Sequence, residues 1–408
     1  MRILFLTPQL PYPPHQGAAL RNFNLIKNLA RDHEIHILSF GDPAQDPGPL
    51  IRYCATIRVI PFPRRRSVER MVTTFLSRHA DMELRLRSVD FRRRLESLLQ
   101  KEGFDIIQAE GLEMAQYLSL APRRGRPVPV FDDHNAEYVL QRRAWELDRH
   151  SPFRWPSAIY SLIQWQKLAR YERQVCQRAG AVVAVSEADR RALEALAPGL
   201  SVTVVPNGID PDYFYPYPER VQKACGTRLV FTGTLDYRPN VDALVWFCRE
   251  VLSRVARREP EVKLYIVGQR PHRRVQALAG ERVVITGWVP DVRPYLARSA
   301  VYVVPLRIGG GTRFKLLEAM ASGVPVVSTR LGAEGIAVVD GEDVLLADSA
   351  SDFAERVLEL LRSPERAARL ARRARERVVA EYDWRLLVPR LREVYERVLD
   401  STSPHSHG

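Results

Sequence analysis

Short apolar runs alternate with longer amphipathic stretches along nearly the whole chain, and this alternation limits the possible folds most strongly. In the first half, six runs rich in Val, Ile and Leu have the near-continuous hydrophobicity of parallel strands covered on both faces. They span 2–6, 34–40, 57–62, 105–109, 128–131 and 181–186. Amphipathic helical stretches such as 18–32, 90–102 and 157–178 lie between several of them. The pattern predicts a doubly wound α/β domain.

A proline-rich segment interrupts this rhythm near the middle of the chain. Pro206-Asn207-Gly208 is followed by prolines at 211, 216 and 218, a density that indicates a linker or hinge. A second series of strand-like runs follows, over 229–233, 263–267, 283–286, 301–305, 324–328 and 344–347. We therefore predict domains over 1–206 and 207–381, an amphipathic helix over 382–400 and a disordered tail over 401–408. The apolar side of that helix carries Leu387, Leu391, Val394, Tyr395 and Val398.

Charge, cysteine positions and the lengths of apolar runs indicate which classes of protein the chain can belong to. The net charge of +13 favours partners that carry phosphate. Cys54, Cys176, Cys225 and Cys248 form no CxxC pair, which argues against a zinc site or a disulfide framework and suits a reducing compartment. The chain has no apolar run of the roughly 20 residues that a membrane span needs, and its opening apolar stretch is too short for a signal peptide. We expect a cytoplasmic protein.

A glycine-rich loop near the end of the second series is the strongest candidate for chemistry. The strand-like run at 301–305 leads through Gly309-Gly310-Gly311 into a helix at 316–321. Arg313 and Lys315 lie at the N-terminal end of that helix, where the helix dipole favours acidic residues. Two cations there are unfavourable unless an anion such as a diphosphate neutralises them. The alternative is a flexible loop with solvated charges.

Three further positions are candidates. Gly17 precedes a helix and would let the backbone approach a phosphate, although a glycine there also suits an ordinary turn. Glu318 follows Lys315 by about one turn, so its carboxylate would bind a ribose diol or pair with Lys315. His134 lies in a cluster of polar residues directly after the run 128–131, where a histidine suits proton transfer.

At these residues the chain resembles the retaining glycosyltransferases of family 4. The similarity runs in order through the opening MRILFLTPQLPYPPHQGAALRNFNL, DDHNAEY, AVVAVSEAD, VVPNGID, FTGTLDYRPNVDAL, YIVGQ and VVITGWVPDVRPYL. It is most specific in VVPLRIGGGTRFKLLEAMASGVPVVST. The resemblance implies the B-type glycosyltransferase fold of two facing Rossmann-like domains, with the C-terminal helix crossing back to the N-terminal domain.

The resemblance also implies how the residues divide the work. The N-terminal domain would bind the acceptor and the C-terminal domain the nucleotide sugar. Donor diphosphate would be bound by Gly17, Arg238, Gly311, Thr312, Arg313 and Lys315, ribose and base by Glu318, Gly287, Trp288 and Val289, and donor sugar by Gly309 and Gly310. His134 matches the family's active-site histidine. No metal or other cofactor is implied, and Asp210-Pro211-Asp212 indicates a turn in the hinge more than a metal-binding DxD motif.

Two departures from the family pattern bear on the donor. Gly310 stands where many members have a glutamate eight positions before the one that Glu318 matches, so contacts to the sugar hydroxyls must come from backbone amides or elsewhere. Thr234 stands where many members have an arginine, and Arg238 is the nearest cation. We infer that Arg313 and Lys315 replace the missing charge.

An arginine-rich segment over 64–94 carries an apolar patch of Met71, Val72, Phe75 and Leu76. Such a segment would lie on an anionic membrane or form a solvated face. Nucleic acid is not the expected partner, because aromatic residues are not interleaved with the charges.

We expect the chain to transfer a sugar from a nucleotide-diphosphate sugar to a glycan or lipid-linked acceptor, in the synthesis of cell-surface polysaccharide or glycolipid. A non-catalytic nucleotide-sugar-binding protein and a sugar-nucleotide 2-epimerase of the same fold are the alternatives. The identities of the sugar, base, acceptor and linkage stay open, as does the oligomeric state.

Overall fold

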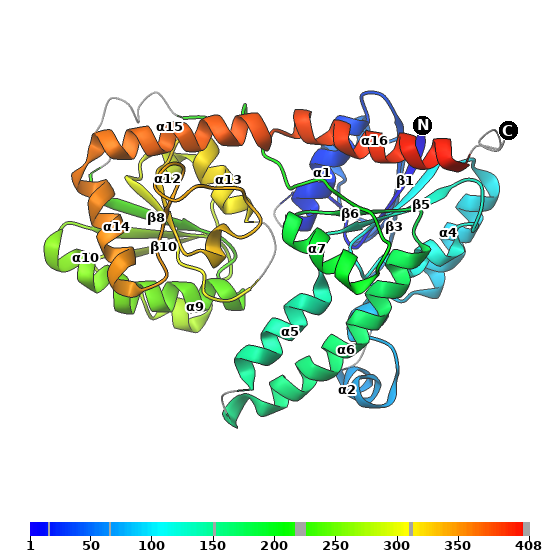
Figure 1. The fold of residues 1–408 in the computed structure, drawn as a ribbon, viewed down its shortest axis with the longest axis horizontal. Coiled ribbons are helices and arrows are strands. Elements are labelled where there is room, and N and C mark those ends of the chain that lie inside the picture. Colours follow the sequence, from blue (N-terminus) through cyan, green and yellow to red (C-terminus); the bar gives the residue numbers. More distant parts are fainter. Residues whose placement is uncertain (15–16, 65–66, 150–151, 217–225, 310–312, 403–408) are drawn as a thin grey trace. The chain divides into compact units, whose positions relative to one another are not determined.

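The computed structural model describes residues 1–14, 17–64, 67–149, 152–216, 226–309 and 313–402, with the side chains of 67–71 and 152 left out (Figure 1). It divides into two compact units, of which the first comprises Met1–Pro206 and Trp384–Gly408 and the second Asn207–Asp383. Each unit is an α/β domain built on a parallel sheet.

The first unit contains a seven-stranded sheet of order β3-β2-β1-β4-β5-β6-β7. Its strands are β1 (Arg2–Thr7), β2 (Glu34–Phe40), β3 (Thr56–Ile60), β4 (Ile106–Glu110), β5 (Val128–Asp133), β6 (Ala181–Ala184) and β7 (Val202–Val204). Its helices are α1 (Gly17–Leu29), α2 (Ser67–Leu76), α3 (Asp81–Arg85), α4 (Val89–Lys101), α5 (Glu137–Asp148), α6 (Trp155–Arg178), α7 (Glu187–Leu196) and α16 (Trp384–Thr402). Every pairing is parallel, as the apolar runs predict.

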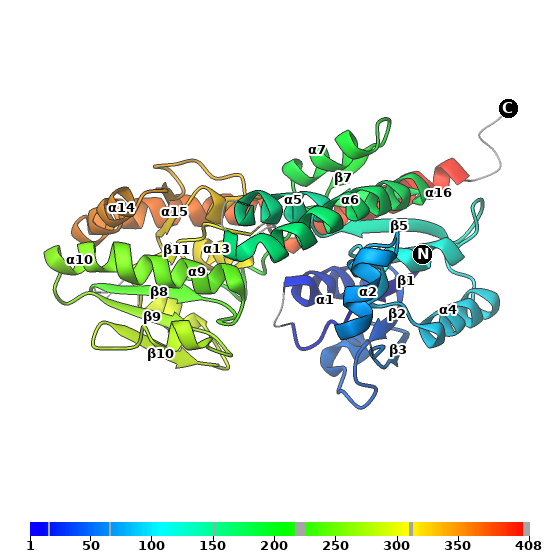
Figure 2. The same cartoon turned by 90° about the horizontal axis from the view of Figure 1, so that it is seen from below.

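The second unit contains a six-stranded parallel sheet of order β10-β9-β8-β11-β12-β13. Its strands are β8 (Arg228–Thr232), β9 (Lys263–Val267), β10 (Val283–Gly287), β11 (Val301–Val304), β12 (Val326–Ser328) and β13 (Leu345–Leu346). Its helices include α9 (Arg238–Trp246), α10 (Ser253–Arg258), α11 (Arg273–Gln276), α12 (Arg293–Ala297), α13 (Phe314–Ala321), α14 (Ala350–Arg362) and α15 (Pro364–Glu381). Helices cover both faces of this sheet (Figures 1 and 2).

Side chains of β8 alternate between two apolar cores, as the two-residue period of a strand requires. Leu229 and Phe231 pack with residues of α9, α10 and α14 on one face of the sheet. Val230 packs on the other face, with residues of α13 and α15. The central strand is therefore buried on both sides, which explains why its sequence is continuously apolar.

Helix α16 belongs to the first unit, although it is the last element of the chain. It packs against α1, and the five apolar residues predicted for one side of the helix are all buried. It continues to Thr402, so residues 401 and 402 are helical and not part of a disordered tail. The hydroxyls of Ser401 and Thr402 donate to the carbonyl oxygen of Val398 (2.9 and 3.1 Å), which satisfies acceptors of the last turn.

Two local predictions differ from the structure. β7, a strand of three residues, was not expected from the sequence. The helix expected over 241–257 begins earlier, at Arg238, because Pro239 suits the first turn, and a π-helical turn at Phe247–Leu252 separates α9 from α10. In the described part of the chain, no helix is both long and apolar enough to cross a membrane.

Candidate functional site

The predicted site residues lie in two places, one in each unit. In each sheet the strand order reverses beside the first strand, between β1 and β4 and between β8 and β11. Ligands of open α/β sheets bind outside the carboxyl ends of the strands at such a reversal. Gly17, the first residue of α1, follows β1, and His134 follows β5. The Gly309 loop follows β11 in the second unit.

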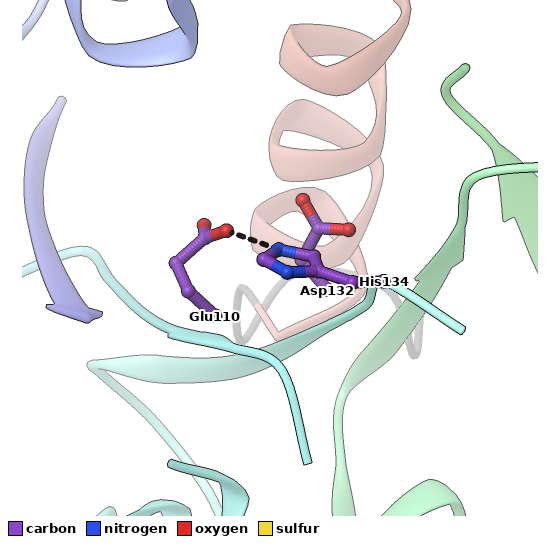
Figure 3. A group of neighbouring side chains, drawn as sticks. All are labelled: Glu110, Asp132 and His134. Atoms are coloured by element: carbon purple, nitrogen blue, oxygen red, sulfur yellow. Dashed lines mark hydrogen bonds and ion pairs between the residues drawn. The ribbon is translucent and has the colours of Figure 1, made fainter. Parts of the chain in front are cut away.

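In the first unit, His134 lies beside two carboxylates that come from strand ends. Glu110 ends β4 and Asp132 is in β5, and both side chains are fully buried (Figure 3). The imidazole Nε2 of His134 lies 2.9 Å from Glu110 Oε2, while its side chain stays 16% exposed. Glu110 thus occupies Nε2 of the imidazole, and Nδ1 is the ring nitrogen that would face a reacting group.

A buried arginine neutralises part of this cluster. The guanidinium of Arg21 binds both carboxylate oxygens of Asp132, with Nε–Oδ2 and Nη2–Oδ1 distances of 3.0 and 3.1 Å. Arg21 also donates to the carbonyl oxygen of Val205 (3.0 Å). Arg21 is 1% exposed and Asp132 0% exposed, so this is a desolvated ion pair in which each charge depends on the other.

The same cluster has the composition of a possible metal site. Glu110, Asp132 and His134 each offer one ligand atom, and these atoms lie within 4.8 Å of one another. However, Arg21 already occupies both oxygens of Asp132, and His134 occupies an oxygen of Glu110. These residues therefore fit a hydrogen-bonded network better than a divalent cation.

Part of the polar cluster around His134 has a structural role. Glu172, on α6, accepts the backbone N–H groups of Glu137 and Tyr138 (2.9 and 3.1 Å) and so holds the first turn of α5. Burial raises the pKa of Glu172 to about 8. Burial also raises the pKa of Asp133 well above its usual range, and neighbouring carboxylates including Glu172 add to the shift. These groups support the loop on which His134 stands.

In the second unit, Lys315 is held in a small polar and aromatic pocket. Its Nζ donates to Asn240 Oδ1 (2.9 Å) and lies 4.2 Å from the ring centroid of Phe231. Burial and, to a smaller extent, the Arg313 guanidinium lower the pKa of Lys315 to about 7. In the free protein the charged ammonium is therefore destabilised relative to the neutral amine, and a bound anion would reverse this effect.

Arg313 occupies the N-cap position of α13 and is 8% exposed. A Cβ atom at Gly309 would lie 3.4 Å from Arg313 Nη2, so the guanidinium reaches back to the glycine loop. Two cations thus lie at the N-terminus of one helix, as the sequence predicts. Gly310, Gly311 and Thr312, assigned to donor sugar and diphosphate, lie outside the described residues.

Glycines allow the close packing around Lys315. A Cβ atom at Gly233 would lie 2.8 Å from Lys315 Nζ, and one at Gly268 would lie 1.7 Å from the carbonyl oxygen of Gly233. Gly233 also has a positive φ of 151°. These glycines let the ends of β8 and β9 approach each other beside the lysine.

Glu318 lies one turn along α13 from Lys315. Burial raises the pKa of Glu318 to about 7, and the charge of Lys315 opposes the shift. Among the residues that the structure describes, no ion pair joins the two side chains. The rival interpretation, a direct pair with Lys315, is not what the geometry gives.

The remaining predicted residues lie at strand and helix ends of the second unit. Gly287 ends β10 with a positive φ of 72°, and Trp288 beside it is 61% exposed. Val289 packs against the adjoining core. Arg238 is the first residue of α9 and is exposed.

The DxD-like segment forms a turn. Asp210 Oδ1 accepts the backbone N–H groups of Asp212 (3.1 Å) and Tyr213 (3.2 Å), which is the hydrogen bonding of an Asx turn. Asp210 therefore serves the backbone.

Sequence reasoning missed several partners of the predicted residues. Glu110, Arg21 and Asn240 contact His134, Asp132 and Lys315 respectively from distant parts of the chain. The one available signal was the polar pair Gln108 and Glu110 in an otherwise apolar strand. No short-range pattern connects these residues to their partners.

Comparisons with known proteins agree with this architecture. Residues 15–213 match the family described as "Glycosyltransferase Family 4", and residues 226–363 match "Glycosyl transferases group 1". The chain is 30% identical over 246 residues to a GDP-mannose-dependent alpha-(1-6)-phosphatidylinositol monomannoside mannosyltransferase of Mycolicibacterium smegmatis. That match covers 54% of this chain and 63% of the relative, so the chain spans less than two thirds of the relative's length.

Solved structures show the same fold at low identity. Sucrose-phosphate synthase from Thermosynechococcus elongatus superposes with a TM-score of 0.75 at 20% identity, covering 98% of this chain and all of that one. HepE of Anabaena, in complex with UDP, gives a TM-score of 0.71 at 17% identity, covering 97% of this chain and all of that one. With both family matches in sequence order on two parallel-sheet domains, the chain belongs to the family-4 glycosyltransferases and has their B-type fold.

Proposed function

We propose that this protein transfers a sugar from a nucleotide-diphosphate sugar to a glycan or lipid-linked acceptor, with retention of anomeric configuration and without a metal. The observation that carries the proposal is the cation pair of Arg313 and Lys315 at the N-terminus of α13. Both cations are held beside a glycine loop, and the pKa of Lys315 is lowered to about 7 because its charge is desolvated. A diphosphate would be bound by both cations and by the N-terminus of the helix.

The chemistry follows from where charge develops. As the glycosidic bond breaks, negative charge grows on the leaving nucleoside diphosphate, and prepositioned cations stabilise that charge. We assign this role to Arg313 and Lys315, with Gly17, Arg238 and the backbone of Gly311 and Thr312 as further diphosphate contacts. Because these groups supply the positive charge, the reaction as proposed needs no metal.

Other donor contacts are assigned by chemistry. The carboxylate of Glu318 suits the two hydroxyls of a ribose. The backbone of Gly287, Trp288 and Val289 would contact the base, and that of Gly309 and Gly310 the donor sugar.

We assign proton transfer at the acceptor hydroxyl to His134. Its Nε2 is occupied by Glu110, so Nδ1 is the nitrogen that would interact with the acceptor. The acceptor would be a glycan or a lipid-linked glycan of the cell surface. The mannosyltransferase relative acts on a phosphatidylinositol mannoside, which supports a glycolipid acceptor.

Turnover on a donor panel tests the proposal. Purified protein would be incubated with UDP-, GDP- and ADP-sugars and a lipid extract, with and without EDTA, and the products followed by proton NMR. We expect nucleoside diphosphate release and a product of retained configuration, unaffected by EDTA. An epimerised donor would favour the 2-epimerase alternative. If His134→Ala still binds the donor, and neither wild type nor the variant transfers sugar to any acceptor, the protein would be a non-catalytic nucleotide-sugar binder.

We also propose that the protein works in the cytoplasm at an anionic membrane surface, through α2 and the N-terminal turns of α6. Phe75 and Leu76 on α2 are 62% and 83% exposed, and Trp155 and Ile159 on α6 are also exposed. Lys167 of α6 donates to the carbonyl oxygen of Thr74 (2.7 Å), so the two helices lie side by side. Arg65 and Arg66 lie outside the described residues, as do the side chains of Arg70 and Met71.

Vesicle flotation tests this surface. We expect binding to vesicles that contain phosphatidylglycerol, weaker binding to phosphatidylcholine alone, and loss of binding in Phe75→Ser/Leu76→Ser. Leu386→Ser removes an equally apolar side chain that is 48% exposed on α16 and serves as the control. Equal binding by wild type and the double variant would contradict the proposal.

A further inference from the structure

A buried chain of hydrogen bonds runs from the C-terminal helix to His134. The hydroxyl of Tyr395, on α16, donates to Gln108 Oε1. Gln108 Nε2 donates to Glu110 Oε1 (2.6 Å), and Glu110 Oε2 lies 2.9 Å from His134 Nε2. Tyr395, Gln108 and Glu110 are all 0% exposed, so their polar groups depend on one another for hydrogen bonds.

The direction of each bond in this chain is determined by the first. Because the phenol donates to the amide oxygen of Gln108, the amide NH₂ faces Glu110. In the amide orientation that gives both of its polar atoms a partner, Asn22 also donates to Glu110 Oε2 (2.6 Å). With donors placed on both of its oxygens, the Glu110 carboxylate is an acceptor toward His134. Neutral His134 therefore carries its proton on Nε2 and presents the lone pair of Nδ1.

The phenol is suited to remain the donor. Burial raises the pKa of Tyr395 well above its usual range, and the charges of Glu110 and Asp132 raise it further. The ring is fixed by its place on the apolar side of α16, which packs against α1. In Figure 3 the pale red helix beside Asp132 is α16.

We propose that Tyr395 is a positioning residue for His134, acting through Gln108 and Glu110 to hold the imidazole as the Nε2–H tautomer with Nδ1 available to the acceptor. This rests on the proposed role of His134 in transfer. It gives the last helix of the chain a part in the chemistry of the first unit, across a sequence separation of 287 residues from Gln108.

Nitrogen NMR of histidine-labelled protein tests the proposal without any substrate. The chain has nine histidines, and loss of one set of signals in His134→Gln assigns that residue. We expect the Nε2–H tautomer to dominate in wild type. Tyr395→Phe should lower the Nε2–H to Nδ1–H ratio about fivefold, the effect of one lost hydrogen bond.

Two further variants keep the result decisive. Gln108→Met interrupts the chain at its middle and should lower the ratio at least as much, with no additional effect of Tyr395→Phe in that background. Tyr117→Phe is the matched control, since its buried hydroxyl donates to the carbonyl oxygen of Leu86 (2.7 Å) and belongs to no such chain. An unchanged ratio in Tyr395→Phe and Gln108→Met would overturn the proposal, even if both variants lost stability.

Turnover separates this proposal from the one on which it rests. If sugar transfer is observed, kcat should fall in Tyr395→Phe in proportion to the fraction of His134 that no longer carries its proton on Nε2, while the KM for the donor is unchanged. Absence of transfer in wild type would refute the proposed function while the tautomer ratios still decide the role of Tyr395. Transfer with an identical kcat and pH profile in Tyr395→Phe would refute the positioning role alone.

Discussion

Binding of the donor should be coupled to protonation of Lys315. In the free protein, burial and Arg313 lower the pKa of Lys315 to about 7. A bound diphosphate favours the ammonium and would restore the pKa of Lys315 toward its ordinary range. Donor binding above pH 7 must therefore take up a proton.

The size of the effect follows from that pKa. At pH 8 about nine tenths of Lys315 is neutral in the free protein, so each bound donor should take up about 0.9 proton. As pH rises through 7 the competent ammonium is lost, and the affinity should fall about eightfold between pH 7.5 and pH 8.5. Nucleotide sugars suit the experiment because their diphosphate, esterified at both ends, does not titrate in this range.

Isothermal titration calorimetry in buffers of different ionisation enthalpy measures the proton uptake directly. Lys315→Met should bind more weakly, with no uptake and no alkaline loss of affinity. Lys263→Met, which removes an exposed lysine of the same unit, should behave as wild type. Equal uptake in wild type and Lys315→Met, or none in wild type, would refute the reasoning.

Three other substitutions have expected outcomes. Arg21→Met leaves its buried carboxylate partner unpaired and should lower the free energy of unfolding by about 3–5 kcal/mol in urea denaturation, whereas exposed Arg142→Met should cost less than about 1 kcal/mol; similar costs would contradict the burial argument. Gly233→Ala would place a Cβ atom 2.8 Å from Lys315 Nζ and should raise the donor Kd at least about fivefold in calorimetry; an unchanged Kd would remove Lys315 from the site. Leu391→Ala on α16 should lower the free energy of unfolding by about 2–5 kcal/mol, and a near-neutral result would show that α16 is not docked.

The sequence predicted most of the fold because buried parallel strands have a local signature. The runs 34–40 and 263–267 coincide with β2 and β9, whose residues are mostly buried. β7 was missed because three residues are too few to show a period. The π-helical turn at Phe247–Leu252 has no sequence signal either, since its residues also suit an ordinary helix.

The candidate site was predictable only where one residue type in one place indicates chemistry. His134 was predictable because it lies in a polar cluster directly after a strand. Arg313 and Lys315 were predictable because they follow a strand and place two cations at a helix N-terminus, where structure alone favours acidic residues. Their partners were not predictable, because contacts such as that between Glu110 and His134 depend on which strands are neighbours in the sheet. Tyr395 was predicted as an apolar contact of the last helix, and its hydroxyl bond to Gln108 required the tertiary structure.

The most direct test of the central claim is donor binding by calorimetry across a panel of UDP-, GDP- and ADP-sugars. Arg307→Ala is the control, because Arg307 lies in the same loop but forms an exposed ion pair with Asp242 (3.0 Å). We predict that wild type and Arg307→Ala bind one donor tightly and that Arg313→Ala/Lys315→Ala binds it at least about tenfold more weakly. Failure of every nucleotide sugar to bind, or equal binding by the double variant, would contradict this prediction.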